Sequence, residues 1–315
     1  MKSKALKFGF FLMAFVMTFI SCGDDDDGPT VTFEERDRTE QQVADKDSLL
    51  LYLSTHYYNS SVFESGVNHK ITDIEITELP SGDTVPSGST LLIDAVETLT
   101  TTYLETDYEY YILRLNQGGG DSPRFSDDVR VRYEGFLAQT DATFDVVATP
   151  EDLPMQGTGF TGGVIRGWQL ILSEFGTSLD FFNDAQGITN YNDYGLGMMF
   201  IPSGLAYFSI PRPNIPTYSN LIFKFELLQY EEADHDNDGV PTYIEDYNGN
   251  LDVFDDDTDD NEVPDFIDLD DDGDGVFTIF EDIDGDGDPT NDIGANGIPK
   301  YLDPEETESN QDEDS

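Results

Sequence analysis

Residues 231–315 carry so much negative charge that they cannot fold as an ordinary globular segment does. They contain 33 aspartates and glutamates and a single lysine or arginine, Lys300. Carboxylates held a few ångströms apart repel one another, and few apolar side chains are present here to build a core that would offset the repulsion. The segment must therefore either stay expanded or fold around bound cations.

Two stretches of this acidic segment match a calcium-binding loop in full. Residues 234–245 (DHDNDGVPTYIE) and 270–281 (DDDGDGVFTIFE) both follow the template D-x-D-x-D-G-x5-E. In such a loop alternate carboxylates converge on one hard cation, glycine permits a sharp turn, the seventh residue offers its carbonyl, and the last glutamate binds through both oxygens. The predicted calcium ligands are Asp234, Asp236, Asp238, Val240, Glu245, Asp270, Asp272, Asp274, Val276 and Glu281.

Looser copies of the template continue the pattern. The predicted ligands of one copy are Asp257, Asp259, Asn261 and Asp268. A second copy runs from Asp292 to Asp303, and residues 282–288 add further alternating carboxylates. Successive loops begin about 11–13 residues apart, which leaves no room for the helices that flank an EF-hand loop.

The repeats also share an apolar dipeptide. Val-Pro at 240–241 and 263–264 and Ile-Pro at 298–299 occupy the seventh and eighth loop positions. With this feature the segment resembles the tandem calcium-wrapped repeats of thrombospondin type 3. The resemblance implies structural calcium in the tail, in sites with dissociation constants of about 10⁻⁴–10⁻³ M, as in other extracellular modules. The alternative is a disordered acidic tail that binds no metal.

Residues 1–22 have the pattern of a bacterial export signal. Lys2, Lys4 and Lys7 precede an apolar run at 8–20 that is too short to span a membrane. Cys22, the only cysteine of the chain, follows at once, and the sequence FISC resembles the lipobox of bacterial lipoproteins. This resemblance implies cleavage before Cys22 and its acylation, so that the membrane is a partner through a lipid anchor. The alternative is an ordinary signal peptide with an incidental cysteine.

An acidic run follows the cysteine directly, at residues 23–27. It resembles the surface-export signal of some Gram-negative lipoproteins. We therefore expect an exported protein, lipid-anchored to the outer membrane of a Gram-negative bacterium. The sequence leaves open whether the anchor lies in the periplasmic leaflet or in the outer leaflet, where the protein would be exposed at the surface. The alternative interpretation of the run is a solvated spacer, which we extend over residues 23–44.

Composition excludes several classes of function. The formal net charge of −51 argues against a nucleic-acid partner, because binding to phosphates depends on lysine and arginine. A single cysteine excludes a disulfide framework and any cysteine-rich metal site. The hydrophobic content of 37% and the aromatic content of 12% indicate that the chain upstream of the acidic tail is folded.

An accessory region is predicted over residues 45–105. Asp45 and Asp47 are candidate N-caps for a helix. Its apolar side chains at helical spacing are Leu49, Leu50, Leu53 and Tyr57. Alternation of Ile74 and Ile76 with polar neighbours predicts a strand over 71–79. No residue pattern typical of catalysis is evident in this region.

Residues 106–230 have the pattern of an α+β domain. The segments YEYYILRL, VRVRYEG and LIFKFELL alternate apolar and polar residues, which predicts half-buried antiparallel strands. Between them VIRGWQLILSEFG carries apolar residues at helical spacing, with Gly176 as the predicted residue that ends the helix. We therefore predict a curled antiparallel sheet wrapped around one short helix.

The order of several short motifs resembles FKBP-type peptidyl-prolyl cis-trans isomerases. Six motifs within residues 106–230 follow the order found in that family. They are YEG, Phe144-Asp145, VIRGW, Leu-Ala-Tyr, Ile-Pro and LIFKFELL. The resemblance implies an apolar pocket between sheet and helix, with Trp168 as its floor. Its residues would be Tyr133, Phe144, Asp145, Val164, Ile165, Trp168, Tyr207, Ile215 and Phe223. The roles of the equivalent residues in that family imply that the Ile165 backbone N–H and the Tyr207 hydroxyl hold substrate carbonyls. They also imply that Asp145 orients the substrate.

Three departures from the family pattern bear on the pocket. Phe208 stands where the family usually has glycine, so we expect the loop to turn differently there. Leu153 or Met155 takes the place of a pocket phenylalanine, and Gly163 replaces an acidic residue. About fifteen additional residues between 176 and 204 are expected at the pocket mouth, where they would tune or cover the site.

The implied activity is rotation of X–Pro bonds in proline-containing polypeptides, in support of the folding of extracytoplasmic proteins. Rotation faces a barrier of about 18–20 kcal/mol, because amide resonance must be lost. A dry aromatic pocket favours the less dipolar twisted state, so neither a catalytic triad nor a catalytic cofactor is required, and we find no triad. Two alternatives are a non-catalytic FKBP-like binding module or chaperone, and a calcium-dependent adhesive surface lipoprotein.

Overall fold

The computed structural model describes residues 34–311. The chain divides into two compact units, Met1–Glu35 and Arg36–Ser315, and all elements described below belong to the second. The export signal, Cys22 and the acidic run at 23–27 lie outside the described residues. Within the described part of the chain, no helix has the length and apolar character needed to cross a bilayer.

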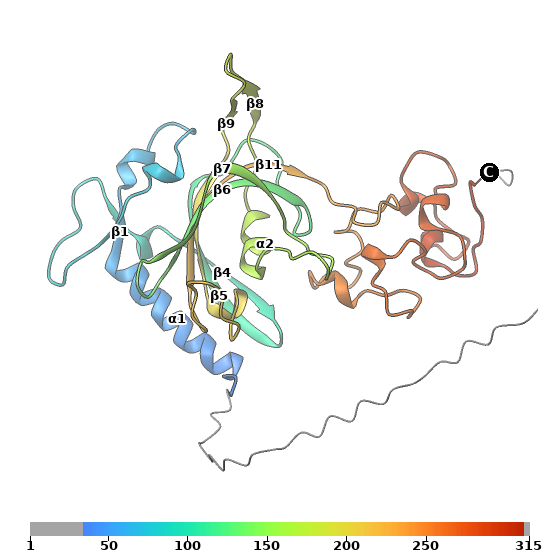
Figure 1. Ribbon diagram of the computed structural model, residues 1–315, viewed down its shortest axis with the longest axis horizontal. Coiled ribbons are helices and arrows are strands. Elements are labelled where there is room, and N and C mark those ends of the chain that lie inside the picture. Colours follow the sequence, from blue (N-terminus) through green and yellow to red (C-terminus); the bar gives the residue numbers. More distant parts are fainter. Residues whose placement is uncertain (1–33, 312–315) are drawn as a thin grey trace, which may run out of the picture. The chain divides into compact units, whose positions relative to one another are not determined.

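A six-stranded antiparallel sheet forms the centre of the second unit and confirms the predicted α+β class (Figure 1). Its strand order is β4-β5-β10-β11-β6-β7. The strands are β4 (Glu97–Tyr103), β5 (Thr106–Asn116), β6 (Asp128–Leu137), β7 (Thr143–Pro154), β10 (Gly195–Ile201) and β11 (Leu221–Glu231). Because β4 pairs with β5, the sheet takes in a strand upstream of residue 106, where the sequence placed the domain boundary.

One face of the sheet curves around the short helix α2 (Arg166–Leu172) (Figure 1). The side chains that were predicted to share a face do so, because a strand alternates its side chains between two faces. Val131 of β6 and Phe225 of β11 join Trp168 and Ile171 of α2 in one buried cluster. The apolar alternation of these strands therefore predicted the core that supports the helix.

Helix α2 ends earlier than the sequence predicts. Its C-cap is Ser173, not the residue before Gly176. Gly176 serves a different purpose: its N–H donates to the Gln117 carbonyl at 2.8 Å, and a Cβ built on it would lie 2.5 Å from the Gly120 carbonyl oxygen. The glycine is required by close backbone approach rather than by a helix terminus.

Helix α1 (Arg38–Thr55) packs on the opposite face of the sheet. Leu49 and Leu53 are fully buried with Phe200 and Ile222 of the sheet. The true N-cap is Asp37, whose side chain accepts from the Glu40 N–H, so the predicted caps are wrong. Residues 38–44, assigned to the spacer from their polar character, form the first turns of this helix.

Asp45, one of the two wrongly predicted caps, is instead a buried anchor inside α1. Its carboxylate accepts hydrogen bonds from the Ser203 backbone N–H at 2.9 Å and the Ser203 hydroxyl at 2.6 Å. Gln41 donates to its other oxygen at 2.7 Å. The helix is therefore joined to the loop after β10 by polar contacts as well as by its apolar face.

The rest of the accessory region forms a small three-stranded sheet. Its strands are β1 (His56–Tyr58), β2 (Ile76–Glu78) and β3 (Thr90–Leu91), in the order β2-β1-β3. Tyr57 therefore lies in β1 and not on the helix. The strand predicted over 71–79 is correct only at 76–78, because Lys70 and Asp73 close a 3-10 turn over Ile71–Asp73.

Residues 177–203, where about fifteen additional residues were predicted, contain a hairpin and the strand β10 of the large sheet. The hairpin consists of β8 (Asp180–Asn183) and β9 (Thr189–Asn192), which pair only with each other and extend away from the sheet (Figure 1). Phe181 and Phe182 in the middle of β8 are 54% and 60% exposed.

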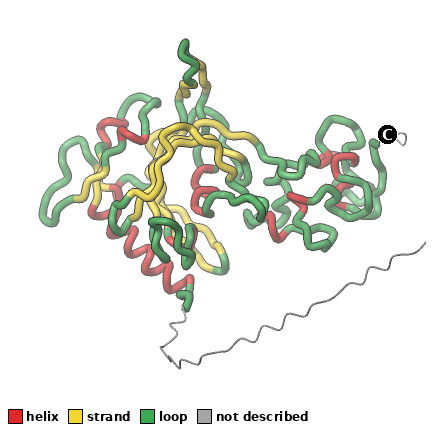
Figure 2. The backbone as a smooth tube through the Cα atoms, viewed as in Figure 1, coloured by secondary structure: helices red, strands yellow, loops and turns green. Residues whose placement is uncertain are grey.

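Residues 232–311 contain loops and short helical turns only (Figure 2). The turns are Val253–Asp255, Asp265–Ile267, Thr278–Phe280, Pro289–Asn291 and Lys300–Leu302. Phe125, Val253 and Phe266 form a small apolar cluster, the largest that this part of the described chain contributes to. None of the helical turns in residues 232–311 is longer than three residues.

Candidate functional site

A cavity of about 200 Å³ lies between α2 and the sheet. It is lined by Tyr133, Phe144, Asp145, Leu153, Gly163, Val164, Ile165, Trp168, Tyr207 and Phe223. Eight of the nine predicted pocket residues are thus brought together. Leu153, not Met155, occupies the wall, and none of the lining residues comes from the insertion between 176 and 204, so the expectation that it covers the pocket mouth is wrong.

Ile215 is the predicted pocket residue that does not line the cavity. It is 6% exposed and belongs to the buried cluster of the sheet. The turn that carries it closes on itself, with reciprocal backbone hydrogen bonds between Arg212 and Ile215 at 2.9 and 3.0 Å. This turn places the Ile215 side chain in the core rather than at the cavity surface.

The floor and walls of the cavity are aromatic. The Trp168 ring is 3% exposed and meets Tyr133 and Phe223 edge to face, with ring centroids 5.0 and 5.1 Å apart. Phe144 meets Phe223 in the same manner at 5.5 Å. Edge-to-face pairs each contribute about 0.5–1.5 kcal/mol beyond the area they bury. Gly135 makes this packing possible, because a Cβ there would lie 2.7 Å from both the Phe144 and the Phe223 ring.

One carboxylate is fixed at the edge of the cavity. The Tyr133 hydroxyl donates to Asp145 Oδ2 at 2.7 Å. Burial of Tyr133, and secondarily this carboxylate, raise the pKa of the tyrosine above its ordinary value. The phenol therefore stays protonated and holds Asp145 as an acceptor, which suits an orienting group.

Two hydrogen-bond donors of the cavity lining have no acceptor among residues 34–311. The Ile165 backbone N–H precedes α2, and no described residue accepts a hydrogen bond from it. The Tyr207 hydroxyl likewise has no partner among residues 34–311, and burial raises its pKa. Arg212 lies 5.1 Å from the Tyr207 ring. The cavity therefore combines an apolar floor with two donors that could bind carbonyl oxygens.

The turn at Phe208 has a left-handed backbone at a residue other than glycine. Phe208 has φ 47°, in the left-handed region that glycine adopts most readily. Its ring is buried between Arg38, 4.1 Å away, and Tyr218, 5.1 Å away. These contacts hold the Phe208 side chain in place although its backbone has a conformation that glycine adopts more readily.

A second cavity, which the sequence did not indicate, adjoins the first. It has a volume of about 390 Å³ and shares Gly163 and Val164 with the aromatic cavity, while Leu251 and Phe254 of the acidic tail close it. Arg166 at the start of α2 donates to the Asn250 carbonyl at 2.9 Å and to the Leu251 carbonyl. Through this residue the first turn of α2 contacts the tail directly.

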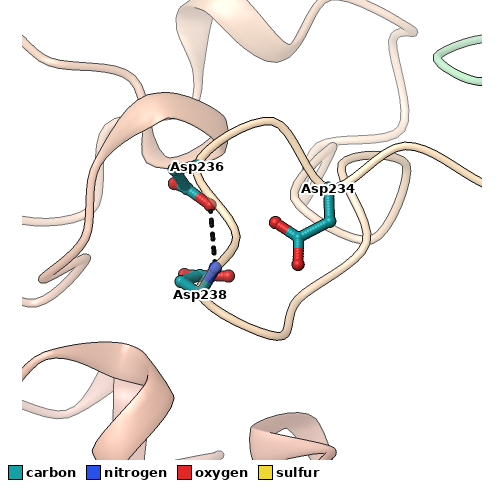
Figure 3. Close-up of side chains that lie close together, drawn as sticks. All are labelled: Asp234, Asp236 and Asp238. Carbon is teal, nitrogen blue, oxygen red and sulfur yellow. Dashed lines mark hydrogen bonds between the residues drawn. The ribbon is translucent and has the colours of Figure 1, made fainter.

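The tail brings the predicted calcium ligands together in two of the three predicted loops. One carboxylate oxygen from each of Asp234, Asp236 and Asp238 lies within 4.8 Å of the others (Figure 3). The equivalent residues Asp270, Asp272 and Asp274 meet the same limit. Residues 282, 284 and 286 form another such group. In the loop that begins at Asp257, Asn261 instead donates to Asp259 at 3.1 Å and Asp268 at 2.7 Å, and its carboxylates form no group of this kind among the described residues.

The residues at the ends of the two full loops test whether a cation fits. Glu245 and Glu281 are 0% and 1% exposed, and neither has a hydrogen-bond partner on either oxygen within the described chain. Burial and neighbouring carboxylates raise the pKa of Glu245 to about 10 and that of Glu281 to about 8. Buried carboxylates without partners are costly, and an all-oxygen donor set is what calcium prefers. The residues therefore fit a hard divalent cation.

One loop escaped the sequence analysis. At Asp246 the chain repeats the hydrogen bonds of the other loops: the N–H of Leu251 donates to Asp246 at 2.9 Å, as that of Gly239 does to Asp234 at 3.1 Å. The sixth positions of all six loops have positive φ, and they are Gly239, Leu251, Glu262, Gly275, Gly287 and Gly297. The regular spacing was the available signal, and Leu251 in place of glycine concealed it.

No protein-family profile matches the chain, and no curated protein matches it. Solved structures similar to parts of it include FkpA from Escherichia coli, with 26% identity, 42% of this chain and 51% of that chain covered, and a TM-score of 0.31. A peptidyl-prolyl cis-trans isomerase from Pseudomonas syringae has 17% identity over 64% of this chain and 100% of its own, with a TM-score of 0.36. The N-terminal domain of FKBP42 from Arabidopsis thaliana has 14% identity and a TM-score of 0.31. The match covers 39% of this chain and 87% of that domain. The chain spans about half the length of FkpA, and the function proposed below rests on the cavity rather than on these scores.

Proposed function

We propose that the sheet and α2 form a peptidyl-prolyl cis-trans isomerase of the FKBP type, acting on proline-containing segments of extracytoplasmic proteins. The observation that carries the proposal is the aromatic cavity floored by Trp168, with the Ile165 N–H and the Tyr207 hydroxyl unpaired in its lining. Eight of the nine residues selected by motif order line it.

The cavity can promote rotation without transferring a proton. A proline ring seated on Trp168 would place its imide bond among Tyr133, Phe144 and Phe223, in surroundings poor in hydrogen-bond partners for the planar amide dipole. The twisted state is less dipolar, so such surroundings favour it relative to the ground state. The donors on Ile165 and Tyr207 would hold flanking carbonyls, and Asp145, fixed by Tyr133, would orient the peptide.

The test is a proline-isomerisation assay on the full chain, with Tyr207→Phe and Asp145→Ala as variants. We expect the wild type to accelerate isomerisation and each variant to retain a reduced rate, by about 2–10-fold for one lost hydrogen bond. Phe182→Ser, on the exposed hairpin, is the matched control and should not change the rate. A folded wild type with no rate enhancement would refute the proposal.

A second function is favoured by the β8–β9 hairpin. Leu179, Phe181, Phe182 and Ile188 are all more than half exposed, which is unusual for large apolar side chains grouped on one short hairpin. We propose that the hairpin holds unfolded substrate segments, as a chaperone would. Suppression of aggregation of an unfolded client should then fall in Phe182→Ser although isomerisation of a short peptide does not.

We further propose that the tail binds calcium and that Cys22 anchors the protein to a membrane. Calcium is supported by the buried, unpaired Glu245 and Glu281, and a change of circular dichroism at millimolar calcium would test it. The anchor, an export signal and a location at the outer membrane of a Gram-negative bacterium rest on the sequence of residues 1–27. Incorporation of labelled palmitate into the wild type and not into Cys22→Ser would support the anchor.

A further inference from the structure

Three buried carboxylates from two different calcium loops meet inside the tail. Asp238 and Glu245 belong to the loop 234–245, whereas Asp271 belongs to the loop 270–281. One oxygen from each residue lies within 4.8 Å of the other two, and the three side chains are 0%, 0% and 1% exposed. We call these three residues the inter-loop cluster.

The cluster has almost no hydrogen-bond partners. Both oxygens of Glu245, both of Asp271 and Oδ2 of Asp238 are buried and unpaired within the described residues. Three unpaired carboxylates in one buried place are costly, and a divalent cation bound between them would offset two of the three negative charges while accepting their oxygens as ligands.

Comparison of the loops shows why Asp271 differs from its equivalents. In the loop 234–245 the side chain at the second position, His235, contacts Thr242 at the ninth position, at 2.8 Å. In the loop that begins at Asp257, Thr258 donates to Asp265 at 2.6 Å in the same two positions. Asp271 contacts its ninth-position partner, Thr278, only through its backbone N–H, at 3.4 Å. Its carboxylate is therefore left free to reach into another loop.

The loop 234–245 also lacks one ligand that Asp271 could replace. In an EF-type loop the ninth position often contributes an oxygen, directly or through water. Here that position is Thr242, whose hydroxyl is already paired with His235. Calcium takes six to eight oxygens, and a carboxylate from outside the loop would restore the number.

We propose that Asp271 is a ligand, contributed from another loop, of the cation bound by residues 234–245, so that one calcium ion joins the first loop of the tail to the fourth. The inference rests on the proposal that the tail binds calcium, and it is independent of isomerase activity. It makes the tail a folded unit closed by a metal between non-adjacent repeats, rather than a row of loops that fill separately.

The experiment is a calorimetric calcium titration of the full chain and of Asp271→Asn, with Asp260→Asn as the control. Asp260 is an exposed aspartate of the tail, so its substitution removes the same charge without touching a buried carboxylate. We expect Asp271→Asn to lower the affinity of one site by about tenfold or more, since ligand charge count sets calcium affinity. An Asp271→Asn titration that matches the wild type, or a loss shared by Asp260→Asn, would overturn the inference.

Hydrogen exchange of residues 234–245 separates a ligand from a merely structural residue. With calcium, Asp271→Asn should lower the exchange protection of these amides below that of the wild type. In chelator their protection should equal or exceed that of the wild type, because the neutral amide removes a buried charge. Equal loss of protection in both conditions would refute the inference. Glu245→Gln should give the same reversal. If the wild type binds no calcium, the calcium proposal fails together with the inference, while the isomerase assay stands apart.

Discussion

The sheet domain and the acidic tail are built on opposite kinds of interior. Around α2 the buried side chains are Trp168, Phe225, Ile171 and their apolar neighbours. In the tail the most deeply buried side chains include Asp238, Glu245 and Asp271, and apolar clusters are small. Both regions contain buried side chains, yet only the sheet domain has a core built mainly of apolar side chains.

This difference means that the two regions depend on different conditions. Burial of apolar surface stabilises by about 25 cal/mol per Å² and needs no partner from solution. Burial of a carboxylate costs several kcal/mol unless a counter-charge accompanies it. The sheet domain should therefore be stable by itself, and the tail should be stable only at the calcium concentration outside a cell.

Removal of calcium should have the largest effect and act on one region alone. In excess chelator we expect residues 232–311 to lose most of their hydrogen-exchange protection, because the carboxylates then repel one another. The emission of Trp168, the only tryptophan, should stay that of a buried indole. Exposure of Trp168 together with the tail would show that the regions are not independent, and a tail still protected would show that it needs no cation.

Trp168→Ala tests the other side of the comparison. Truncating a buried tryptophan typically costs about 3–5 kcal/mol, so urea denaturation of the sheet domain in chelator should show a loss of this size. Isomerase activity should also disappear. Calcium titration of the tail should be unchanged, and Trp168→Phe should lose less of both stability and activity. Weakened calcium binding in Trp168→Ala would contradict the prediction that the tail is stable independently of the sheet domain.

Asp45→Ala should show that the sheet domain also depends on one buried carboxylate. It leaves the Ser203 hydroxyl without its acceptor and the Ser203 N–H with Asn220 Oδ1 alone, which should lower the free energy of unfolding by about 1–3 kcal/mol. The exposed Asp47, changed to alanine, is the matched control. No difference between the two variants would refute the anchoring role of Asp45.

The same residue predicts a pH dependence. Burial raises the pKa of Asp45 above its ordinary value of 3.8, despite the donors around it. Its contribution to stability is therefore complete below pH 3.8 and declines as the pH rises through the raised pKa. Denaturation curves of the wild type and Asp45→Asn should diverge in this way, and parallel curves would contradict it.

Arg166→Lys should have the smallest effect, at the contact between the regions. Lysine keeps the charge but cannot reach two carbonyls at once, so we expect a loss of about 0.5–1.5 kcal/mol. The loss should appear as faster exchange near residues 246–255, with the sheet unaffected. Unchanged exchange there would show that the contact contributes nothing.

The apolar part of the fold was predictable because its signal is local. Alternation placed Val131 and Phe225 on one face, and helical spacing placed Trp168 and Ile171 beside them. The start of α1 was missed because residues 38–44 are polar, and nothing in the sequence indicates that Ser203 will hold Asp45. Long-range polar contacts of this kind carry no periodicity.

The candidate sites divide in the same manner. Motif order selected the lining of the cavity, and the error at Ile215 came from a turn whose closure the sequence does not reveal. The loop at Asp246 was hidden by Leu251, which has the backbone conformation of glycine without being one. The role of Asp271 could not be assigned, because in a run of three aspartates only the structure shows which carboxylate leaves its own loop.

The left-handed backbone at Leu251 and Glu262 sets the order in which the tail would come apart. A residue with a Cβ costs about 1–2 kcal/mol in this conformation, and glycine avoids that cost at the equivalent position of the other loops. As calcium becomes scarce, the two strained loops would open first and leave their neighbours closed. The tail would then lengthen in steps, with the two loops that contain Leu251 and Glu262 opening between loops that stay closed.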